Sequence, residues 1–404
     1  MNIRTHLKPI TYVHFYVESF DPRRGGMEGS AARLVQYFES DPQIRFIGHV
    51  IRPHDKTKSP RGLARVFDLD KEARALLEPL VPANTVLEIS HSTRLHILMG
   101  TQILQKLLQK HPQDRHVLLS YYLPTAGFIA QNLACQLNLP HIACSRGSDL
   151  GHDVFYKDIV PGIEFVAKRA SCLVTTNLQH EQIARRVCGR EGEICTIYNG
   201  LQKNVRPHWR RQKNARVRLV SAIGYCVKKG THLLVEAVKQ LIEEGLPIEL
   251  VIVGPTRIGN WDRFFRQMYA TGYNDLIRMK GQIEPDKIKS FLLHGDIYCS
   301  AALSEGCSNA TMLALGLGMP IVSTATGALR DLATEMDHVD MVAAASITEL
   351  MTAIRRMVRK ILNGSLVVNN DRVGEIVKRL SADREHSDWK ELLMRFAVER
   401  NSAT

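Results

Sequence analysis

The feature that most constrains the fold is the alternation of strand-like and helix-like segments along nearly all of the 404 residues. This pattern is typical of parallel α/β sheets, in which a helix carries the chain back to the start of the next strand. The strands expected in the first half are Tyr12–Val17, Arg45–His49, His116–Leu119, His141–Cys144 and Cys172–Thr175, and those in the second half are Arg218–Ala222, Ile248–Val253, Ile297–Ser300 and Pro320–Ser323.

Between these strands, apolar residues recur at the spacing of amphipathic helices. The helices expected are Ser30–Phe38, Ile97–Gln109, Ala126–Leu137, Thr231–Glu244, Asp286–Leu293, Asn309–Leu317 and Ile347–Leu362. A last amphipathic stretch, Ser387–Arg400, must bury its apolar face on another part of the chain.

The length predicts two domains, because a single core seldom serves so many residues. A basic segment with few apolar residues, Gln202–Val217, separates the two halves and is predicted to be an exposed linker. An alternative is that its cations form a rim that attracts an anionic ligand. The expected domains are residues 1–203 and 204–380, each Rossmann-like, followed by a terminal helix in residues 381–404.

Composition narrows the classes of protein. No apolar run reaches the roughly 18 residues that a membrane helix needs, and Ile10–Val17 lacks the cleavage site of a signal peptide. The eight cysteines occur singly, which argues against a zinc or disulfide framework and favours a cytoplasmic location. The net charge of +12 favours anionic partners such as phosphate esters or an anionic membrane face, whereas no nucleic-acid recognition motif is present.

Gly25 and Gly26 follow the first expected strand and precede a helix. Paired glycines allow a tight turn and a close approach of the backbone to a ligand. The start of the next helix offers free N–H groups and the positive end of the helix dipole. Since the sequence contains no GxGxxG motif, a nicotinamide or flavin dinucleotide is not expected.

The densest signal is the segment from Ser304 to Ala310, directly after the strand Ile297–Ser300. Ser308 or Asn309 can cap the helix that follows. This helix start would lie at the carboxyl edge of the sheet, where α/β proteins hold their ligands. A diphosphate there would meet backbone N–H groups, and Glu305 could hydrogen-bond sugar hydroxyls. Lys229, in the loop after the strand Arg218–Ala222, could neutralise phosphate charge.

In their order along the chain, these motifs resemble the retaining GT-B glycosyltransferases of family 4. The resemblance runs from the Gly25-Gly26 loop to the terminal helix, through Ile197-Tyr198-Asn199-Gly200, Lys229-Gly230, Val253-Gly254, Gly281 and Ser304-Glu305-Gly306. It implies two Rossmann-like domains that face each other across a cleft, with the C-terminal helix crossing back to the first domain.

The resemblance also implies an activity. A hexose-type sugar would pass from a nucleotide-diphosphate sugar to a hydroxyl acceptor, with retention and without a metal or a further cofactor. Glu305 and Lys229 would be the catalytic residues. Further contacts to the donor would come from Gly25, Gly26, Gly224, Gly254, Gly306, Cys307, Ser308 and Asn309. The acceptor would be a glycan, a lipid-linked sugar or a small-molecule glycoside.

The chain departs from the family in three places. Leu313 stands where a second glutamate commonly binds the ribose, Tyr225 stands where an arginine follows Gly224, and no histidine occurs near Tyr121–Pro124. A leucine cannot accept hydrogen bonds from ribose hydroxyls, so weak donor binding is expected. Two alternatives therefore stay open: a sugar-nucleotide-binding subunit with weak or no activity, and a GT-B epimerase.

On the acceptor side, the candidates are Arg146, Asp149 and Tyr122. Arg146 could meet an acidic acceptor or a donor phosphate, and Asp149 could orient it. The alternative is an internal Arg–Asp pair that braces the loop.

Two further features have a structural and a functional interpretation. Asp68-Leu69-Asp70 matches a metal-binding DxD but is predicted to cap a helical stretch, Lys71–Leu77. The helix Ile97–Gln109 has Arg94 and Lys110 at its ends, which fits either peripheral contact with an anionic membrane or an ordinary core face.

Overall fold

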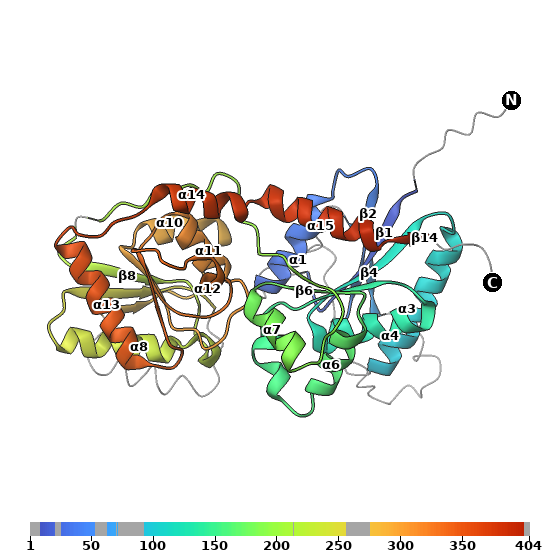
Figure 1. Cartoon of the computed structure of the whole chain (residues 1–404), viewed down its shortest axis with the longest axis horizontal. Helices are drawn as coiled ribbons and strands as arrows, with labels where there is room; N and C mark the ends of the chain where they lie inside the picture. The colour runs from blue at the N-terminus through green and yellow to red at the C-terminus, as the bar shows by residue number, and fades with distance from the viewer. Residues whose placement is uncertain are drawn as a thin grey trace. The chain divides into compact units, whose positions relative to one another are not determined.

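The computed structural model describes residues 9–20, 26–52, 63–69, 71, 93–212, 214–255 and 275–399. The chain divides into two compact units (Figure 1). The first comprises Met1–Ile197 and Glu385–Thr404, and the second comprises Tyr198–Arg384. The second unit therefore begins at residue 198 and ends at residue 384, whereas the expected second domain begins at residue 204 and ends at residue 380.

The first unit is built on a parallel sheet whose strand order is β3-β2-β1-β4-β5-β6-β7. The strand order reverses between the neighbours β1 and β4. At such a switch point, α/β sheets open a crevice at their carboxyl edge. A short strand at the chain's end, β14 (Val398–Glu399), pairs antiparallel with β4. The seven parallel strands are β1 (Thr11–Val17), β2 (Ile44–Val50), β3 (Leu63–Asp68), β4 (Arg115–Tyr121), β5 (His141–Cys144), β6 (Cys172–Thr175) and β7 (Ile194–Thr196).

Helices cover both faces of this sheet (Figure 1). On one face, apolar residues of β1 and β4 pack against α1 and α15, and on the other they pack against α3 and α4. The helical segments are α1 (Gly26–Tyr37), α3 (Thr93–Lys110), the π-helix η4 (Leu123–Gly127), α4 (Phe128–Leu137), α5 (Ser148–Gly151), η5 (Asp153–Phe155), α6 (Val160–Arg169), α7 (Leu178–Arg186) and α15 (Ala382–Phe396).

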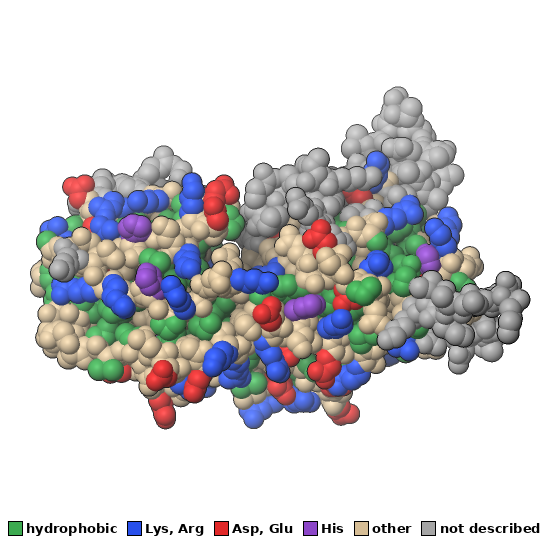
Figure 2. All heavy atoms as spheres, turned by 90° about the horizontal axis from the view of Figure 1, so that it is seen from above, with side chains coloured by type: hydrophobic (Ala, Val, Ile, Leu, Met, Phe, Trp, Pro, Cys, Tyr) green, Lys and Arg blue, Asp and Glu red, His purple; other side chains and the backbone are tan. Residues whose placement is uncertain are grey.

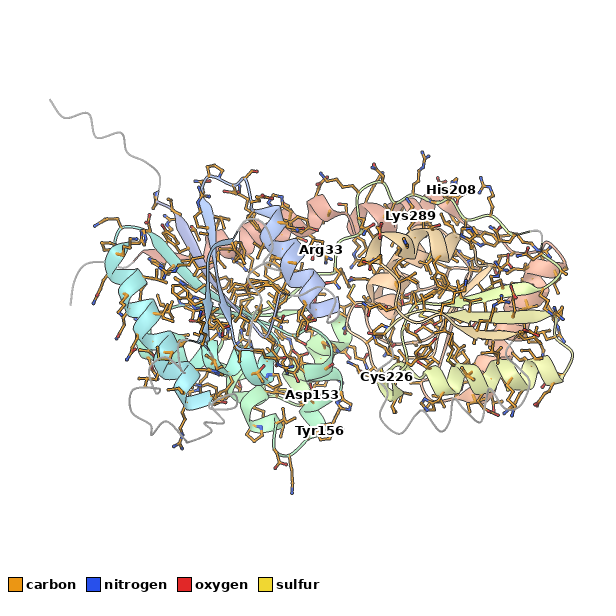
Figure 3. All side chains as sticks on the ribbon, turned by 180° about the vertical axis from the view of Figure 1, so that it is seen from behind. Arg33, Asp153, Tyr156, His208, Cys226 and Lys289 are labelled. Carbon is orange, nitrogen blue, oxygen red and sulfur yellow. The ribbon has the colours of Figure 1, made fainter. Side chains whose placement is uncertain are left out.

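The C-terminal helix α15 packs on the first unit, as the resemblance implied. Trp389 and Leu393 are fully buried in the core that also contains Val13 and Phe15. Glu385 accepts hydrogen bonds from the Arg33 guanidinium at 3.0 Å and from the Tyr37 hydroxyl at 2.7 Å, both on α1 (Figure 3). Apolar burial and a charged clamp thus hold residues of the chain's end against residues near its start.

The second unit contains a six-stranded sheet of order β10-β9-β8-β11-β12-β13, in which every pairing is parallel. Helices α8 and α13 pack on one face, and α10, α11 and α14 on the other. The strands are β8 (Val217–Ser221), β9 (Ile248–Ile252), β10 (Ile277–Met279), β11 (Ile297–Ser300), β12 (Ile321–Thr324) and β13 (Val339–Val342). The helical segments are η6 (Val227–Lys229), α8 (Thr231–Glu243), η7 (Pro285–Lys287), α10 (Ile288–Leu293), α11 (Asn309–Gly316), α12 (Ala328–Leu332), α13 (Ile347–Leu362) and α14 (Asn370–Arg379).

The expectation of an exposed linker at Gln202–Val217 was wrong in part. Its described cations are exposed, but its backbone is fastened to the second unit. The N–H groups of His208 and Trp209 both lie 3.0 Å from the Leu317 carbonyl, and Lys289 donates to the Asn204 carbonyl at 3.3 Å (Figure 3). Val205 is buried in the adjoining core. Apolar contacts of Val205 and Trp209, together with hydrogen bonds, thus dock a segment whose composition is mainly polar.

The surface charge and the lengths of the helices agree with what the composition predicted. On the face shown in Figure 2, the described Lys and Arg side chains are spread over both units. Within the described part of the chain, no helix has the length and apolar character needed to cross a membrane.

Candidate functional site

In the second unit, the expected donor-binding residues lie in loops that follow β8, β9 and β11. Because these strands are parallel, all three loops leave the same edge of the sheet. Gly224 and Gly254 lie back to back, since a Cβ atom on Gly254 would lie 2.4 Å from the Gly224 nitrogen. The hydroxyl of Thr231, the first residue of α8, donates to the Gly224 carbonyl at 2.7 Å. The two glycines therefore serve tight loop packing at this edge.

The two residues expected to be catalytic are in direct contact. Lys229 Nζ donates to Glu305 Oε1 in an ion pair between the loop after β8 and the loop after β11. Both side chains keep some contact with solvent, Lys229 at 28% and Glu305 at 12% exposure. The backbones are joined beside them, because the Leu303 N–H donates to the Lys228 carbonyl at 2.9 Å. A cation and a carboxylate are thus held together at the carboxyl edge of the sheet.

The helix start beyond Glu305 is ordered by local hydrogen bonds. Ser308 is the N-cap of α11, and its hydroxyl accepts the Thr311 N–H at 3.4 Å. The Asn199 amide donates to the Cys307 carbonyl at 2.8 Å and to Asn309 Oδ1 at 2.9 Å. The Asn-Gly turn therefore fixes the segment before α11, whose first N–H groups and dipole favour an anion.

A small hollow opens beside this helix start. It is lined by Glu305, by the hydroxyl-bearing residues Ser300, Ser308, Thr311, Ser323 and Thr326, and by the apolar residues Met312, Ala328 and Leu329. The Gly306 carbonyl on its rim accepts the Ala328 N–H at 2.9 Å. Carboxylate and hydroxyl oxygens beside a lysine and a helix N-terminus can hydrogen-bond a polyhydroxyl ligand that carries a phosphate.

The two departures from the family pattern in this unit are both buried. Tyr225 is 5% exposed, packs in the core below the sheet edge, and donates from its hydroxyl to the Ile252 carbonyl at 3.3 Å. Leu313 is 8% exposed and belongs to the apolar cluster around α11. Neither side chain takes over the polar role of the residue it replaces.

In the first unit, Tyr122 lies between β4 and the π-helix η4 and has an unusual backbone, with φ at +78°. Non-glycine residues rarely adopt positive φ, and such strain is concentrated at functional sites. The Tyr122 hydroxyl donates to Asp153 Oδ2 at 2.8 Å, and Asp153 Oδ1 lies 2.8 Å from His152 Nδ1. His152 Nε2 in turn lies 3.1 Å from the Tyr156 hydroxyl (Figure 3).

These contacts form a polar chain that the sequence analysis did not identify beyond Tyr122. Burial, with the Asp153 hydrogen bond, raises the pKa of the Tyr122 hydroxyl, so this group stays a donor. The chain ends at exposed aromatic rings, since Phe155 is 70% and Tyr156 50% exposed. In the sequence, only the adjacent polar residues His152 and Asp153 pointed to this chain of hydrogen bonds. Nothing in the sequence linked them to Tyr122.

Asp149 and Arg146 brace their loop. The Asp149 carboxylate is fully buried and accepts the N–H groups of Arg146, Gly147 and Leu150 at 3.0–3.1 Å and the Ser145 hydroxyl at 2.8 Å. The Arg146 guanidinium stacks over the Tyr121 ring at 4.4 Å. Asp149 therefore organises the loop through its backbone.

The remaining sequence candidates lie apart from this network. Gly26 is the first residue of α1 and is exposed, whereas Gly25 lies outside the described residues. Asp68 Oδ1 accepts the Lys71 N–H at 3.1 Å, as a helix cap does. Asp70 and Lys71–Leu77, apart from Lys71 itself, lie outside the described residues. In α3 the apolar residues Met99 and Leu104 face the core, and Arg94 and Lys110 are exposed.

Part of the second unit is similar to known proteins. Residues 215–360 match the family model of glycosyl transferases group 1. A putative colanic acid biosynthesis glycosyltransferase, WcaL of Escherichia coli K12, is 30% identical over 113 residues, which are 26% of this chain and 27% of that protein. Its Salmonella typhimurium counterpart is 29% identical over 121 residues. The alignment thus spans little more than a quarter of these relatives.

Solved structures resemble almost the whole chain. Anabaena HepE in complex with UDP and glucose has a TM-score of 0.71 at 13% identity and covers 96% of this chain and 100% of its own. The pneumococcal O-GlcNAc transferase GtfA, in complex with UDP and GlcNAc, has a TM-score of 0.71 at 11% identity over 96% and 99% of the two chains. The expected GT-B fold is confirmed. Residues 215–360 therefore match the group 1 glycosyl transferase model, and the chain as a whole has the GT-B fold.

Proposed function

We propose that the protein is a retaining glycosyltransferase of family 4, which moves a hexose-type sugar from a nucleotide-diphosphate sugar to a hydroxyl acceptor. The observation that carries the proposal is the ion pair of Lys229 and Glu305 beside the start of α11, inside the segment that matches the group 1 model. A cation, a carboxylate and a helix N-terminus at one sheet edge suit a ligand with phosphates and hydroxyls.

In the proposed reaction, Lys229 and the N–H groups at the start of α11 stabilise the charge that develops on the departing diphosphate. Glu305 accepts hydrogen bonds from the sugar hydroxyls. The bond between the anomeric carbon and the phosphate oxygen breaks as the acceptor oxygen bonds to the same face of that carbon. The acceptor's proton passes to the leaving phosphate oxygen, so neither a metal nor a cofactor is required.

Similar proteins support a proposal for the class of substrate. HepE and GtfA were solved with UDP and a sugar, and WcaL is named for colanic acid biosynthesis. We propose a uridine diphosphate hexose as donor and a glycan acceptor, in polysaccharide or glycoconjugate biosynthesis. Tyr122 and Arg146 are the proposed acceptor-side residues, with Asp149 holding their loop. Contact with an anionic membrane, if the acceptor is lipid-linked, would involve exposed cations of α3 such as Arg94 and Lys110.

The test is transfer and hydrolysis of a panel of nucleotide sugars by the pure protein, with and without a chelator. Lys229→Ala should slow turnover by roughly 10²–10³-fold, because one donor to the leaving group is lost. Lys287→Ala is the control, since it removes an exposed lysine of the same unit that lies outside the loops of Lys229 and Glu305. Turnover by Lys229→Ala within a few-fold of wild type would contradict the assigned role.

Loss of activity with chelator, restored by Mn²⁺ or Mg²⁺, would contradict the metal-free mechanism.

A second candidate is a sugar-nucleotide-binding subunit with weak or no activity. It is favoured by the burial of Leu313 and Tyr225, which leaves the ribose and the diphosphate without the two contacts common in the family. The same panel distinguishes the candidates. Binding without any product would support the subunit, and an altered sugar on the nucleotide would support an epimerase.

A further inference from the structure

Two cysteines that are far apart in the sequence meet at the edge of the first unit's sheet. The neighbouring strands β6 and β7 are parallel, with Val174 paired to Cys195. Side chains alternate along a strand, so Cys172, two residues before Val174, lies on the same face as Cys195. The two Sγ atoms are 3.7 Å apart, and Cys195 Sγ lies 3.3 Å from Glu193 Oε1.

This arrangement fits a metal ion better than a disulfide. Tetrahedral zinc with Zn–S bonds of about 2.3 Å holds two sulfurs about 3.8 Å apart, close to the separation seen here. The ligand atoms of Cys172, Glu193 and Cys195 all lie within 4.8 Å of one another. A disulfide would join residues two positions out of register. That offset alone is about 6.6 Å along the strand, before the gap between strands is added.

A cation already occupies the open side of this cluster. The guanidinium of Arg395, on α15, forms an ion pair with Glu193 and lies 3.9 Å from Cys195 Sγ. Both side chains of the pair are nearly half exposed, 49% for Arg395 and 41% for Glu193. An exposed ion pair contributes little stability, so Arg395 can swing into solvent and give up its position to a metal ion.

The segment that carries two of the three ligands, β7 and the residue before it, is held firmly. The guanidinium of Arg190, which is almost fully buried, donates to the Glu193 carbonyl at 2.7 Å and to the Ala170 carbonyl at 2.6 Å. The Leu173 N–H donates to the same Glu193 carbonyl at 3.0 Å. Glu193 and Cys195 are therefore positioned on a fixed backbone beside Cys172, as a preorganised site requires.

We propose that Cys172, Cys195 and Glu193 form a binding site for a thiophilic divalent cation such as Zn²⁺, with water as the fourth ligand. Arg395 occupies the site's positive position when the metal is absent. The two cysteines bind as thiolates, and their protons are released to solvent. The proposal is independent of the proposed transferase activity, because it uses none of the residues assigned to donor or acceptor.

The experiment is a titration of the full-length protein with Co²⁺ under a phosphine reductant, followed by displacement with Zn²⁺. One equivalent of cobalt should produce the visible bands of a tetrahedral site and a thiolate-to-metal charge-transfer band. Cys172→Ser and Cys195→Ser should weaken binding by more than about 100-fold, since even loss of an outer-shell partner weakens it roughly 10–100-fold. Cys135→Ser, which removes an exposed cysteine of the same unit, should bind as wild type does.

Arg395→Ala gives the sharper result. Removing a competing cation should tighten metal binding several-fold, whereas a merely structural arginine would leave the affinity unchanged. Binding that is unchanged or weaker in this variant would overturn the proposal, and so would a wild-type protein without a one-to-one cobalt spectrum. Because Arg395 is exposed, this variant remains informative if a cysteine variant fails to fold.

Discussion

At position 230 the space around the backbone excludes every residue but glycine. Gly230 ends η6 directly after Lys229, with φ at +60°. A Cβ atom there would lie 1.8 Å from the carbonyl oxygen of Ala301, in the loop that leads to Glu305. A side chain at this position would therefore separate the two loops that carry the Lys229–Glu305 pair.

Gly230→Ala should destabilise the second unit and disrupt donor binding. Its matched control is Gly245→Ala, where φ is +84° but nothing lies within 4 Å of the added Cβ. The control should lose only the 1–2 kcal/mol or so that a left-handed backbone costs an L-residue. Urea unfolding and titration with UDP measure both effects. Equal losses of stability in the two variants would show that the contact with Ala301 relaxes freely.

Leu313 shows how a buried position limits what a substitution can restore. Placing the family's glutamate there would put a carboxylate into the apolar cluster around α11. Leu313→Glu should lower the free energy of unfolding by at least about 2 kcal/mol, the lower end for loss of a buried leucine. Calorimetric titration with UDP should show no tighter binding. Tighter binding by a stable variant would instead place the ribose beside residue 313.

Sequence reasoning at this scale found Lys229 and Glu305 because each follows a recognisable strand. It did not predict that they would pair, since 76 residues separate them. The pair Cys172–Cys195 was missed for the same reason. Spacing rules find metal ligands within one loop, whereas these two cysteines come together only through the register of β6 and β7.

At the scale of elements, the parallel strands that the sequence did not reveal lie at the sheet edges. They are β3 and β7 in the first unit, and β10 and β13 in the second. An edge strand has a neighbour on one side only and is less completely buried, as β7 and β13 show. The apolar pattern is therefore weak there, whereas the central strands β1, β4, β8 and β11 were all expected from their continuous apolar runs.

The C-terminal helix α15 should be an integral part of the first unit's stability. Trp389 is fully buried between the sheet and α1. Trp389→Ala should therefore lower that unit's free energy of unfolding by about 3–5 kcal/mol, as for other buried aromatic residues. Glu391→Ala, on the exposed side of the same helix, should change it by less than about 0.5 kcal/mol.

Hydrogen exchange of peptides from β1 and β4 measures this effect in the first unit alone. This matters because a chain of two domains need not unfold in one step. If these strands keep their protection in Trp389→Ala, the helix is only an appended segment.

At the scale of the whole molecule, the chain should lose stability in mild acid. Burial lowers the pKa of His49 and His141 to about 3 and that of His338 to about 4, and it holds the pKa of His14 well below its usual range. In the unfolded chain these groups titrate near 6.5. Between pH 6.5 and the lowered values, the unfolded state binds more protons. Stability is therefore full above pH 6.5 and falls as the pH decreases through this window.

His49 allows a direct test of this dependence. Its ring is stacked between Tyr16, at a centroid distance of 4.3 Å, and Phe67, at 5.5 Å, and neither ring nitrogen has a hydrogen-bond partner among the described residues. His49→Phe keeps an aromatic ring in this stack and removes the titrating group.

At pH 5, a folded-state pKa near 3 corresponds to about 2 kcal/mol of lost stability for one histidine. The variant should therefore lose about that much less than wild type between pH 7.5 and pH 5, whatever its stability at pH 7.5. Urea unfolding at the two pH values provides the measurement, and parallel losses in wild type and His49→Phe would mean that His49 does not titrate on unfolding in this range.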